Sequence, residues 1–143
     1  RGARRGGDLV TAVLVAEAEE ANAALYAAIE TGDFDQLEAL WDSADDLVCV
    51  HPGATMLTGR SRVLRSWAAI LANVDYIQFV LSDVVVRVSG DTAVVTCTEN
   101  VLTGDGSALH GGSGCATNVF RRRDGRWRLW VHHTSPSPGI HDD

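Results

Sequence analysis

The chain has 143 residues, of which 45% are hydrophobic and 22% charged, a composition typical of globular proteins. Its net charge of −7 at pH 7 argues against a nucleic-acid partner, because domains that bind nucleic acid carry clustered basic charge. No apolar run reaches the length of a membrane span, so no membrane partner is expected.

The length predicts one domain with its own hydrophobic core. We expect this domain to occupy residues 1–143, with a flexible N-terminal tail at 1–8 and a short tail at 136–143. The apolar segment 9–16 is followed by glutamates rather than by a cleavage site. The three cysteines form no Cys-x-x-Cys pair, which favours reduced thiols. Together these features predict a cytoplasmic protein.

Two helices are predicted at the start of the chain and a third after the first strand. Apolar residues recur at helical spacing up to Gly32, a residue placed to end the first helix. Asp33 can begin a second, short helix that carries Trp41 on its apolar stripe. Ser61 is expected to cap the third helix, whose buried face includes Trp67.

The remaining chain is predicted to be sheet, in strands at 47–51, 76–89, 92–102, 115–123 and 126–135. The strand 76–89 changes the phase of its apolar alternation at Ser82-Asp83, which predicts a β-bulge that bends it. The glycine-rich segment 104–114, which includes His110, is expected to be a mobile loop. The fold class is therefore α+β, with a strongly curved antiparallel sheet wrapped around N-terminal helices, and such a sheet encloses a cavity.

Strand alternation selects the polar groups that face this cavity. Glu99 shares its parity with a set of aliphatic residues, and Asn118 shares its parity with Phe120. On the last strand, His133 shares its parity with Trp127. A carboxylate among apolar side chains has a raised pKa, which suits a general base. We therefore predict catalytic roles for Glu99 as base, Asn118 as oxyanion donor and His133 as the group that orients or returns the proton.

Aromatic residues and a second histidine are predicted to complete the binding site. His51 ends a strand at a Pro-Gly turn, and Trp41 and Trp67 can form aromatic walls. The predicted ligand is a small, partly apolar molecule, and the residues expected to bind it are Trp41, His51, Trp67, Tyr76 and Trp127. Two alternatives stay open: a buried network in which the same polar groups only order the core, and a metal site of His51, His133 and Glu99. No metal-ligand spacing supports the second, so neither a metal nor another cofactor is expected.

The opposite face of the last strand carries Trp130 and His132. A large aromatic residue on the outer face of a sheet favours a protein interface, because interfaces are enriched in tryptophan and arginine. We expect a second copy of the chain to pack on this face and form a homodimer.

Several segments resemble the NTF2-like superfamily, and within it the SnoaL-like group. They are His51-Pro52-Gly53 ahead of Leu57-Thr58-Gly59-Arg60, Ser66-Trp67, the segment 90–95 and the segment 118–135. The group includes uncharacterised proteins similar to the association domain of calmodulin-dependent kinase II. The resemblance implies a cone-shaped barrel that dimerises through its sheet. The same fold carries isomerases, cyclases, dehydratases, hydrolases and non-catalytic dimers, so it does not select an activity.

Two classes of function therefore stay open. The first is a cofactor-independent isomerase, cyclase or dehydratase, reactions that share a proton transfer next to a carbonyl group. The second is a non-catalytic ligand-binding or dimeric association domain.

Overall fold

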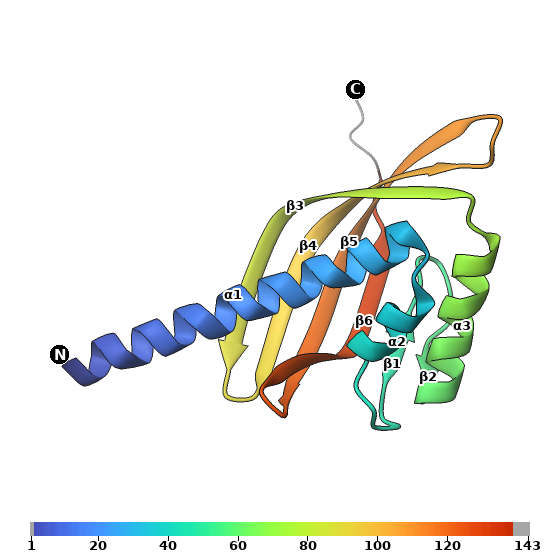
Figure 1. Cartoon of the computed structure of the whole chain (residues 1–143). Coiled ribbons are helices and arrows are strands. Elements are labelled where there is room, and N and C mark those ends of the chain that lie inside the picture. Colours follow the sequence, from blue (N-terminus) through green and yellow to red (C-terminus); the bar gives the residue numbers. More distant parts are fainter. Residues whose placement is uncertain (1, 139–143) are drawn as a thin grey trace.

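The computed structural model describes residues 2–138, with side chains from residue 7 onward. Within this range three helices and six strands form an α+β domain (Figure 1). In chain order they are α1 (Gly2–Thr31), α2 (Phe34–Leu40), β1 (Val48–Val50), β2 (Leu57–Thr58), α3 (Arg60–Asn73), β3 (Tyr76–Ser89), β4 (Thr92–Gly104), β5 (Leu109–Arg123) and β6 (Arg126–Pro136).

The strands form one sheet in the order β2-β1-β6-β5-β4-β3. All neighbouring strands are antiparallel except β1 and β6, which are parallel. The sheet curves around α1, and α2 and α3 lie at its β1–β2 side (Figure 1). The predicted fold class is confirmed. No helix within residues 2–138 has the combination of length and apolar character that a membrane crossing needs.

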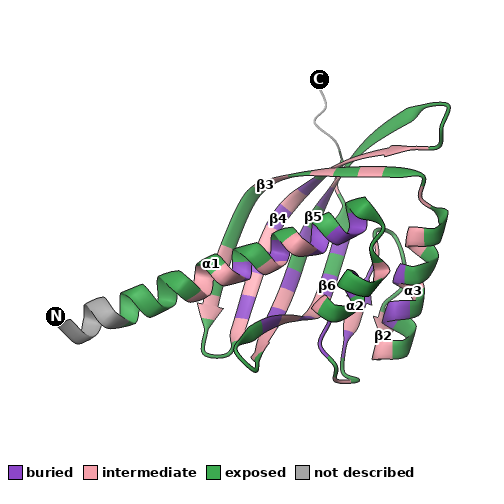
Figure 2. Ribbon diagram, in the orientation of Figure 1, coloured by how far each residue is buried: buried purple, intermediate pink, exposed green. Residues whose placement is uncertain are grey.

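The chain ends differ from the prediction. Helix α1 begins at Gly2, so residues 2–8 are helical where the sequence predicts a flexible tail. Its N-terminal part extends past the edge of the sheet (Figure 1), and residues 7–13 there are exposed (Figure 2). Strand β6 continues to Pro136, and residues 139–143 of the predicted C-terminal tail lie outside the described residues.

The helix ends follow from local chemistry. Gly32 adopts φ 68°, a conformation that glycine reaches without strain, and its N–H donates to Ile29 O at 3.2 Å at the end of α1. The Asp33 carboxylate accepts from Gln36 N at 3.0 Å and caps α2, as predicted. The cap of α3 is Gly59 and not Ser61, so that prediction is wrong by two residues.

The predicted bulge in β3 is confirmed. The pairing of β3 with β4 shifts between Ser82 and Val85, and Asp83 adopts φ 54°. The bulge bends the long strand, so its two halves can follow the curvature of the sheet (Figure 1).

The glycine-rich segment is not a loop. Strands β4 and β5 continue through it as a hairpin, in which Val101 pairs with Gly112 and Thr103 pairs with His110. His110 is therefore a strand residue, although it remains exposed. Glycines in a strand leave its surface without side chains, so this part of the sheet is thin.

A second bulge, in β6, is absent from the prediction. Val119 pairs with Val131, whereas the next residue of β5, Phe120, pairs with Leu129. Trp130 is the extra residue in this register shift, and the alternation of β6 changes phase there. As a result Leu129 and His132, three positions apart, both face the interior.

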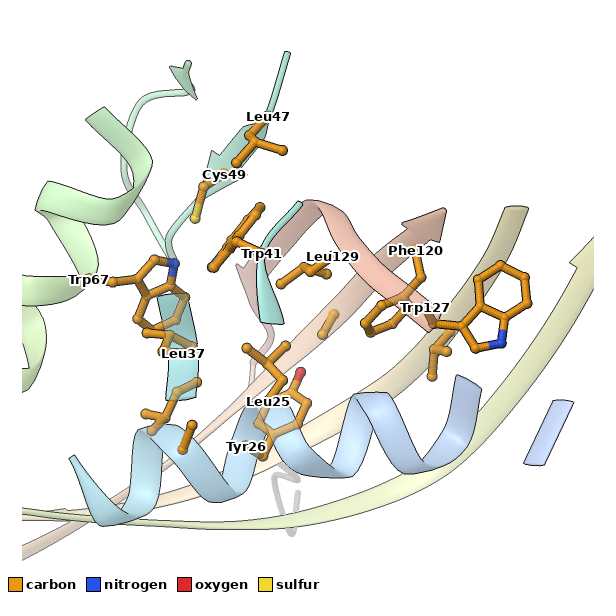
Figure 3. Close-up of a cluster of buried hydrophobic side chains, with 14 of the residues drawn as sticks. Leu25, Tyr26, Leu37, Trp41, Leu47, Cys49, Trp67, Phe120, Trp127 and Leu129 are labelled. Carbon is orange, nitrogen blue, oxygen red and sulfur yellow. The ribbon is translucent and has the colours of Figure 1, made fainter. Parts of the chain in front are cut away.

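The core lies between α1, α2 and the concave face of the sheet (Figure 3). Trp41 and Phe120 are among its largest fully buried side chains. Trp67 and Trp127 lie at opposite ends of the cluster. Replacing such a side chain with alanine typically lowers the stability of a protein by about 3–5 kcal/mol. The main role of these aromatic residues is therefore to stabilise the fold.

Candidate active site

A hollow of about 260 Å³ lies on the concave face of the sheet, next to the β4–β5 hairpin. Valine, proline and glycine residues supply much of its lining. Polar side chains at its inner part include the Glu99 carboxyl and the Thr134 hydroxyl. Its lining residues are Pro52, Glu99, Val101, Thr103, His110, Gly111, Gly112, Ser113, Gly114, Thr134 and Pro136.

Glycines of β5 keep this hollow open. Gly114 pairs with Glu99 across the strands, and a Cβ at Gly114 would lie 2.9 Å from Thr134 Cγ2 and 3.0 Å from Ser135 O. Gly112 is different, because a Cβ there would meet no heavy atom within 4 Å. The absence of a side chain at Gly114 therefore allows β6 to pack closely against β5, and the absence of one at Gly112 leaves open space in the hollow.

Glu99 is buried at 5% exposure, and its two carboxyl oxygens have different surroundings. Oε2 accepts from the Tyr26 hydroxyl at 2.6 Å and from the Thr134 hydroxyl at 3.0 Å. Oε1 has no hydrogen-bonding partner among the described residues, and it is not among their fully buried unpaired atoms. Since Glu99 also lines the hollow, Oε1 is the oxygen that a small molecule there can reach.

Tyr26 and Asn118 connect Glu99 to the deeper core. The Tyr26 hydroxyl has one hydrogen, which it donates to Glu99, so it accepts from Asn118 Nδ2 at 3.1 Å. The same amide group donates its second hydrogen to Asn22 Oδ1 at 2.8 Å. Both hydrogens of Asn118 are thus in use, and its oxygen must be an acceptor.

His132 completes the network. Its tautomer follows from the donor and acceptor roles of the groups that it contacts. Its Nδ1 lies 2.5 Å from Asn118 Oδ1, an acceptor, so Nδ1 carries the hydrogen and donates it. Burial, with smaller contributions from His51 and His133, lowers the pKa of His132 to about 3, so the ring is neutral at pH 7. Its Nε2 is therefore an acceptor, 3.3 Å from the Thr134 hydroxyl.

Electrostatics agree with a carboxyl group suited to proton transfer. Burial raises the pKa of Glu99, and the hydrogen bonds from Tyr26 and Thr134, which favour the carboxylate, oppose part of that rise. Burial and the neighbouring Glu99 also raise the pKa of Tyr26, so the phenol keeps its hydrogen and remains a donor. A buried base with a raised pKa, fixed by neutral donors, is an arrangement typical of catalytic carboxylates.

Two of the three predicted catalytic residues belong to this network. Glu99 and Asn118 face the interior, as strand alternation predicts. The orientation predicted for His133 is wrong, because the bulge at Trp130 places His132 inside and leaves His133 exposed. Asn118 is linked to Glu99 through the Tyr26 hydroxyl, but its own hydrogens do not reach the hollow, so the structure gives it no free donor for an oxyanion.

Three network residues are absent from the sequence-based prediction. Tyr26 and Asn22 lie four positions apart on α1, a spacing that places both on one helix face. This polar pair on an otherwise apolar stripe is the signal that could have identified them. Thr134 could be found only by recognising the phase change in β6.

The residues predicted to bind a ligand do not gather around the hollow. Trp41 and Trp127 are core residues, and the Trp127 indole donates to Leu14 O at 3.1 Å. Tyr76 is 43% exposed at the start of β3, where its hydroxyl donates to Gln78 Oε1. None of these three lines the hollow, so the structure does not support their predicted role.

His51 and Trp67 pack beside the network without lining the hollow. Their ring centroids are 4.7 Å apart, and that of His132 lies 5.5 Å from that of Trp67. The His51 Nε2 lies 2.9 Å from Ser66 Oγ, whose hydrogen goes to Val63 O, so His51 donates this bond. His51 therefore supports the deep side of the network.

The alternative metal site of His51, His133 and Glu99 is not assembled, since His133 lies on the other face of β6. Within the described part of the chain, no group of three His, Cys, Asp or Glu side chains is placed to hold a metal ion. The described cysteines are all free, and burial raises the pKa of the Cys49 thiol to about 12.

Known proteins are similar to this chain in sequence and in structure. A family model described as a SnoaL-like domain matches residues 18–138. The F-box protein SKIP8 of Arabidopsis thaliana is 26% identical over 114 residues, which cover 80% of this chain and 47% of that protein. The chain thus spans about half the length of this curated relative.

Solved structures give closer similarities. A protein of Streptomyces avermitilis, described as a candidate dehydratase of the NTF2-like family, is 49% identical with a TM-score of 0.86, and the match covers 90% of this chain and 99% of that one. A candidate association domain of a calcium/calmodulin-dependent protein kinase type II from Thiobacillus denitrificans is 32% identical with a TM-score of 0.75, over 84% of this chain and 94% of that one. Since the family model and these structures cover most of the sequence, the chain belongs to the SnoaL-like domain family of NTF2-like proteins.

Proposed function

We propose that this chain binds a small, partly apolar carbonyl compound in the hollow beside Glu99 and transfers a proton at the carbon next to the carbonyl. One observation carries this proposal: the buried Glu99 carboxyl holds Oε2 in two hydrogen bonds and leaves Oε1 at the hollow. A base must lie within reach of the proton that it takes, and Oε1 is the atom that satisfies this geometry.

The reaction class favoured by the comparisons is dehydration. In a dehydration Glu99 Oε1 takes the proton from the carbon next to the carbonyl, and a carbon–carbon double bond forms. The hydroxyl group on the neighbouring carbon leaves, receives that proton and departs as water, which restores the carboxylate. The described NTF2-like relative from Streptomyces avermitilis is a candidate dehydratase, and isomerisation or cyclisation would share the first step.

The lining of the hollow sets the class of ligand. Pro52, Val101 and Pro136 offer apolar contacts, and no lysine or arginine of the described residues lines the hollow. A free carboxylate or phosphate would therefore meet Glu99 without a compensating positive charge from lysine or arginine. We infer that the ligand is a neutral carbonyl compound, small enough for a volume of about 260 Å³.

A ligand screen with a blocked variant tests the binding step. We expect Gly112→Leu to fill the hollow without a steric clash, because a Cβ at position 112 meets nothing within 4 Å. A neutral carbonyl compound that binds the wild type stabilises it by about 2.7 kcal/mol at a ligand concentration of about 100 times Kd. The measurement is thermal unfolding with and without each compound, and we expect Gly112→Leu to abolish the ligand-dependent shift.

The matched control is Gly111→Leu. Gly111 lines the hollow with its main chain only. Because neighbouring residues of a strand point to opposite faces, leucine at position 111 faces the outer side of the sheet, where a Cβ also meets nothing within 4 Å. Ligand-dependent stabilisation that survives in Gly112→Leu as fully as in Gly111→Leu would place binding elsewhere and reject this hollow.

We also propose that the outer face of the sheet binds a second copy of the chain. Three valines lie side by side on this face, because Val119 pairs with Val94 on β4 and with Val131 on β6. The proposal keeps the predicted homodimer but changes its residues, since His132 is buried inside and His133 takes its place outside. Trp130 is partly covered within the chain, where its indole donates to Asp46 O and the Arg121 guanidinium lies 4.6 Å from its ring.

A charged residue at the centre of this face should separate the copies. We expect the wild type to have twice the chain mass of 15.3 kDa, and Val119→Arg to be monomeric, because an arginine there would be buried without a partner. Light scattering after size-exclusion chromatography measures both masses. Ala23→Arg, on the exposed side of α1, is the control. A monomeric wild type, or a dimeric Val119→Arg, contradicts the proposed interface.

A further inference from the structure

We propose that Thr134 is a positioning residue whose single hydroxyl hydrogen passes between Glu99 and His132 as Glu99 gains and loses a proton. The inference concerns regulation of the proposed site and rests on the proposed role of Glu99. It assigns His132 a role as an alternative acceptor, without contact between His132 and the ligand.

The geometry places one donor between two acceptors. Thr134 Oγ1 lies 3.0 Å from Glu99 Oε2 and 3.3 Å from His132 Nε2. A threonine hydroxyl has one hydrogen, so it can donate to only one of them at a time. Both acceptors are buried, and an acceptor left without a donor there costs free energy.

The second acceptor exists because of the rest of the network. Tyr26 donates to Glu99, which makes its oxygen the acceptor of an Asn118 hydrogen. The Asn118 oxygen then faces His132 and takes the Nδ1 hydrogen. His132 is thereby held as the tautomer with a bare Nε2 directed toward Thr134.

The charge on Glu99 decides where the hydrogen lies. When Glu99 is a carboxylate, the charge-assisted bond to Oε2 is the stronger one, and His132 Nε2 has no donor. When Glu99 has taken a proton on Oε1, Oε2 is a weaker acceptor and the imidazole nitrogen competes for the hydrogen. Proton uptake by Glu99 therefore relieves the unpaired Nε2, and His132 raises the basicity of Glu99 through Thr134.

The groups that face Glu99 identify what else can affect its titration. They are Tyr26 from α1, Cys97 on the same strand, Thr134 and His132 from β6, and His110 at the rim of the hollow. Tyr26 and Cys97 keep their hydrogens near neutral pH, because burial raises the pKa of both. His110 is exposed, and His110→Gln serves to subtract its contribution.

A double-mutant cycle on the titration of Glu99 tests the coupling. The side-chain carboxyl carbon of Glu99 is followed by NMR in the ¹³C-glutamate-labelled protein and assigned from its loss in Glu99→Gln. Thr134→Val removes a hydrogen bond to the carboxylate, so the Glu99 titration moves to higher pH, by on the order of one unit. His132→Asn keeps a donor for Asn118 but removes Nε2, so the titration moves to lower pH.

The combined variant gives the decisive result. If the coupling passes through Thr134, His132→Asn has no further effect in the Thr134→Val background, and Thr134→Ser, which keeps the hydroxyl, titrates like the wild type. An equal shift from His132→Asn in both backgrounds overturns the inference, because His132 would then act without Thr134.

The same variants separate this inference from the proposed reaction. Proton exchange of a bound ketone is measured across pH in each of them. A coupled titration without exchange at any pH supports the role of Thr134 and rejects the proposed function. If the pH dependence of proton exchange follows the Glu99 titration but His132 is not coupled to it through Thr134, the inference is overturned and the proposed function stands.

Discussion

Replacing Glu99 with glutamine is expected to lower the rate of α-proton exchange in a bound carbonyl compound by about 10²–10⁴-fold, the usual contribution of a positioned general base. Glutamine keeps the shape of the side chain and can still accept from Tyr26 and Thr134, but it cannot take a proton. The measurement is the loss of the α-proton signal by ¹H NMR in D₂O. The exposed Glu19→Gln removes the same charge from α1 and should exchange at the wild-type rate.

Glu99→Gln should lose proton exchange without losing stability. Because folding raises the pKa of Glu99, its contribution to stability is full below the pKa of the unfolded chain and is lost as pH rises through the folded pKa. Above the folded pKa the wild type buries a carboxylate at a cost, so Glu99→Gln should be at least as stable there. A variant that loses both exchange and stability above that pKa would assign Glu99 to the fold and contradict a catalytic role.

Replacing Asp42 with alanine is expected to lower the free energy of unfolding by about 3 kcal/mol. Asp42 is 1% exposed, and its Oδ2 accepts from Arg121 Nε at 2.8 Å and from Arg123 Nε at 3.0 Å. Without it, two guanidinium groups lose their buried partner. This loss of stability is at the low end of the range for buried ion pairs, because Arg121 retains its ion pair with Asp46 and Arg123 is half-exposed. Urea unfolding measures the change.

The pH dependence identifies the cause. Burial alone would raise the pKa of Asp42, but the hydrogen bonds from Arg121 and Arg123 outweigh it and hold that pKa below its usual value. The stabilisation is therefore present above the unfolded pKa of about 3.9 and is lost as pH falls through the folded pKa. The difference between wild type and Asp42→Ala should shrink in acid. Asp46→Ala, at the exposed side of Arg121, is the control and should cost much less than Asp42→Ala, because water screens an exposed ion pair. Equal losses in the two variants would contradict this account.

Sequence patterns predict this fold well because most of its elements obey simple periodicities. The apolar stripe of α1 and the alternation of β4 each depend on one element, and the phase change at Ser82-Asp83 is visible within β3 itself. Glu99 and Asn118 follow from the same rule, since no bulge interrupts the part of the strand that carries them.

The predictions about the sheet that are wrong concern segments whose structure depends on pairing with a neighbouring strand. In β6 the apolar pattern continues through Leu129, Trp130 and Val131 without a visible phase change, so only its pairing with β5 shows the bulge. One extra residue exchanges the two faces, and His132 replaces His133 inside. The glycine-rich hairpin was expected to be a loop for a similar reason, because glycine has no strand preference of its own and cross-strand pairing decides its structure.

The role of Glu99 is tested most directly by two midpoints measured on the wild type. One is the pH at which its ¹³C-labelled carboxyl titrates, and the other is the pH at which α-proton exchange of a bound ketone reaches half its maximum. We predict that the two coincide in the ligand-bound protein, above the value of about 4.3 for an ordinary glutamate. Exchange that continues at full rate below the pH at which Glu99 is protonated would contradict the proposal that this carboxylate is the base.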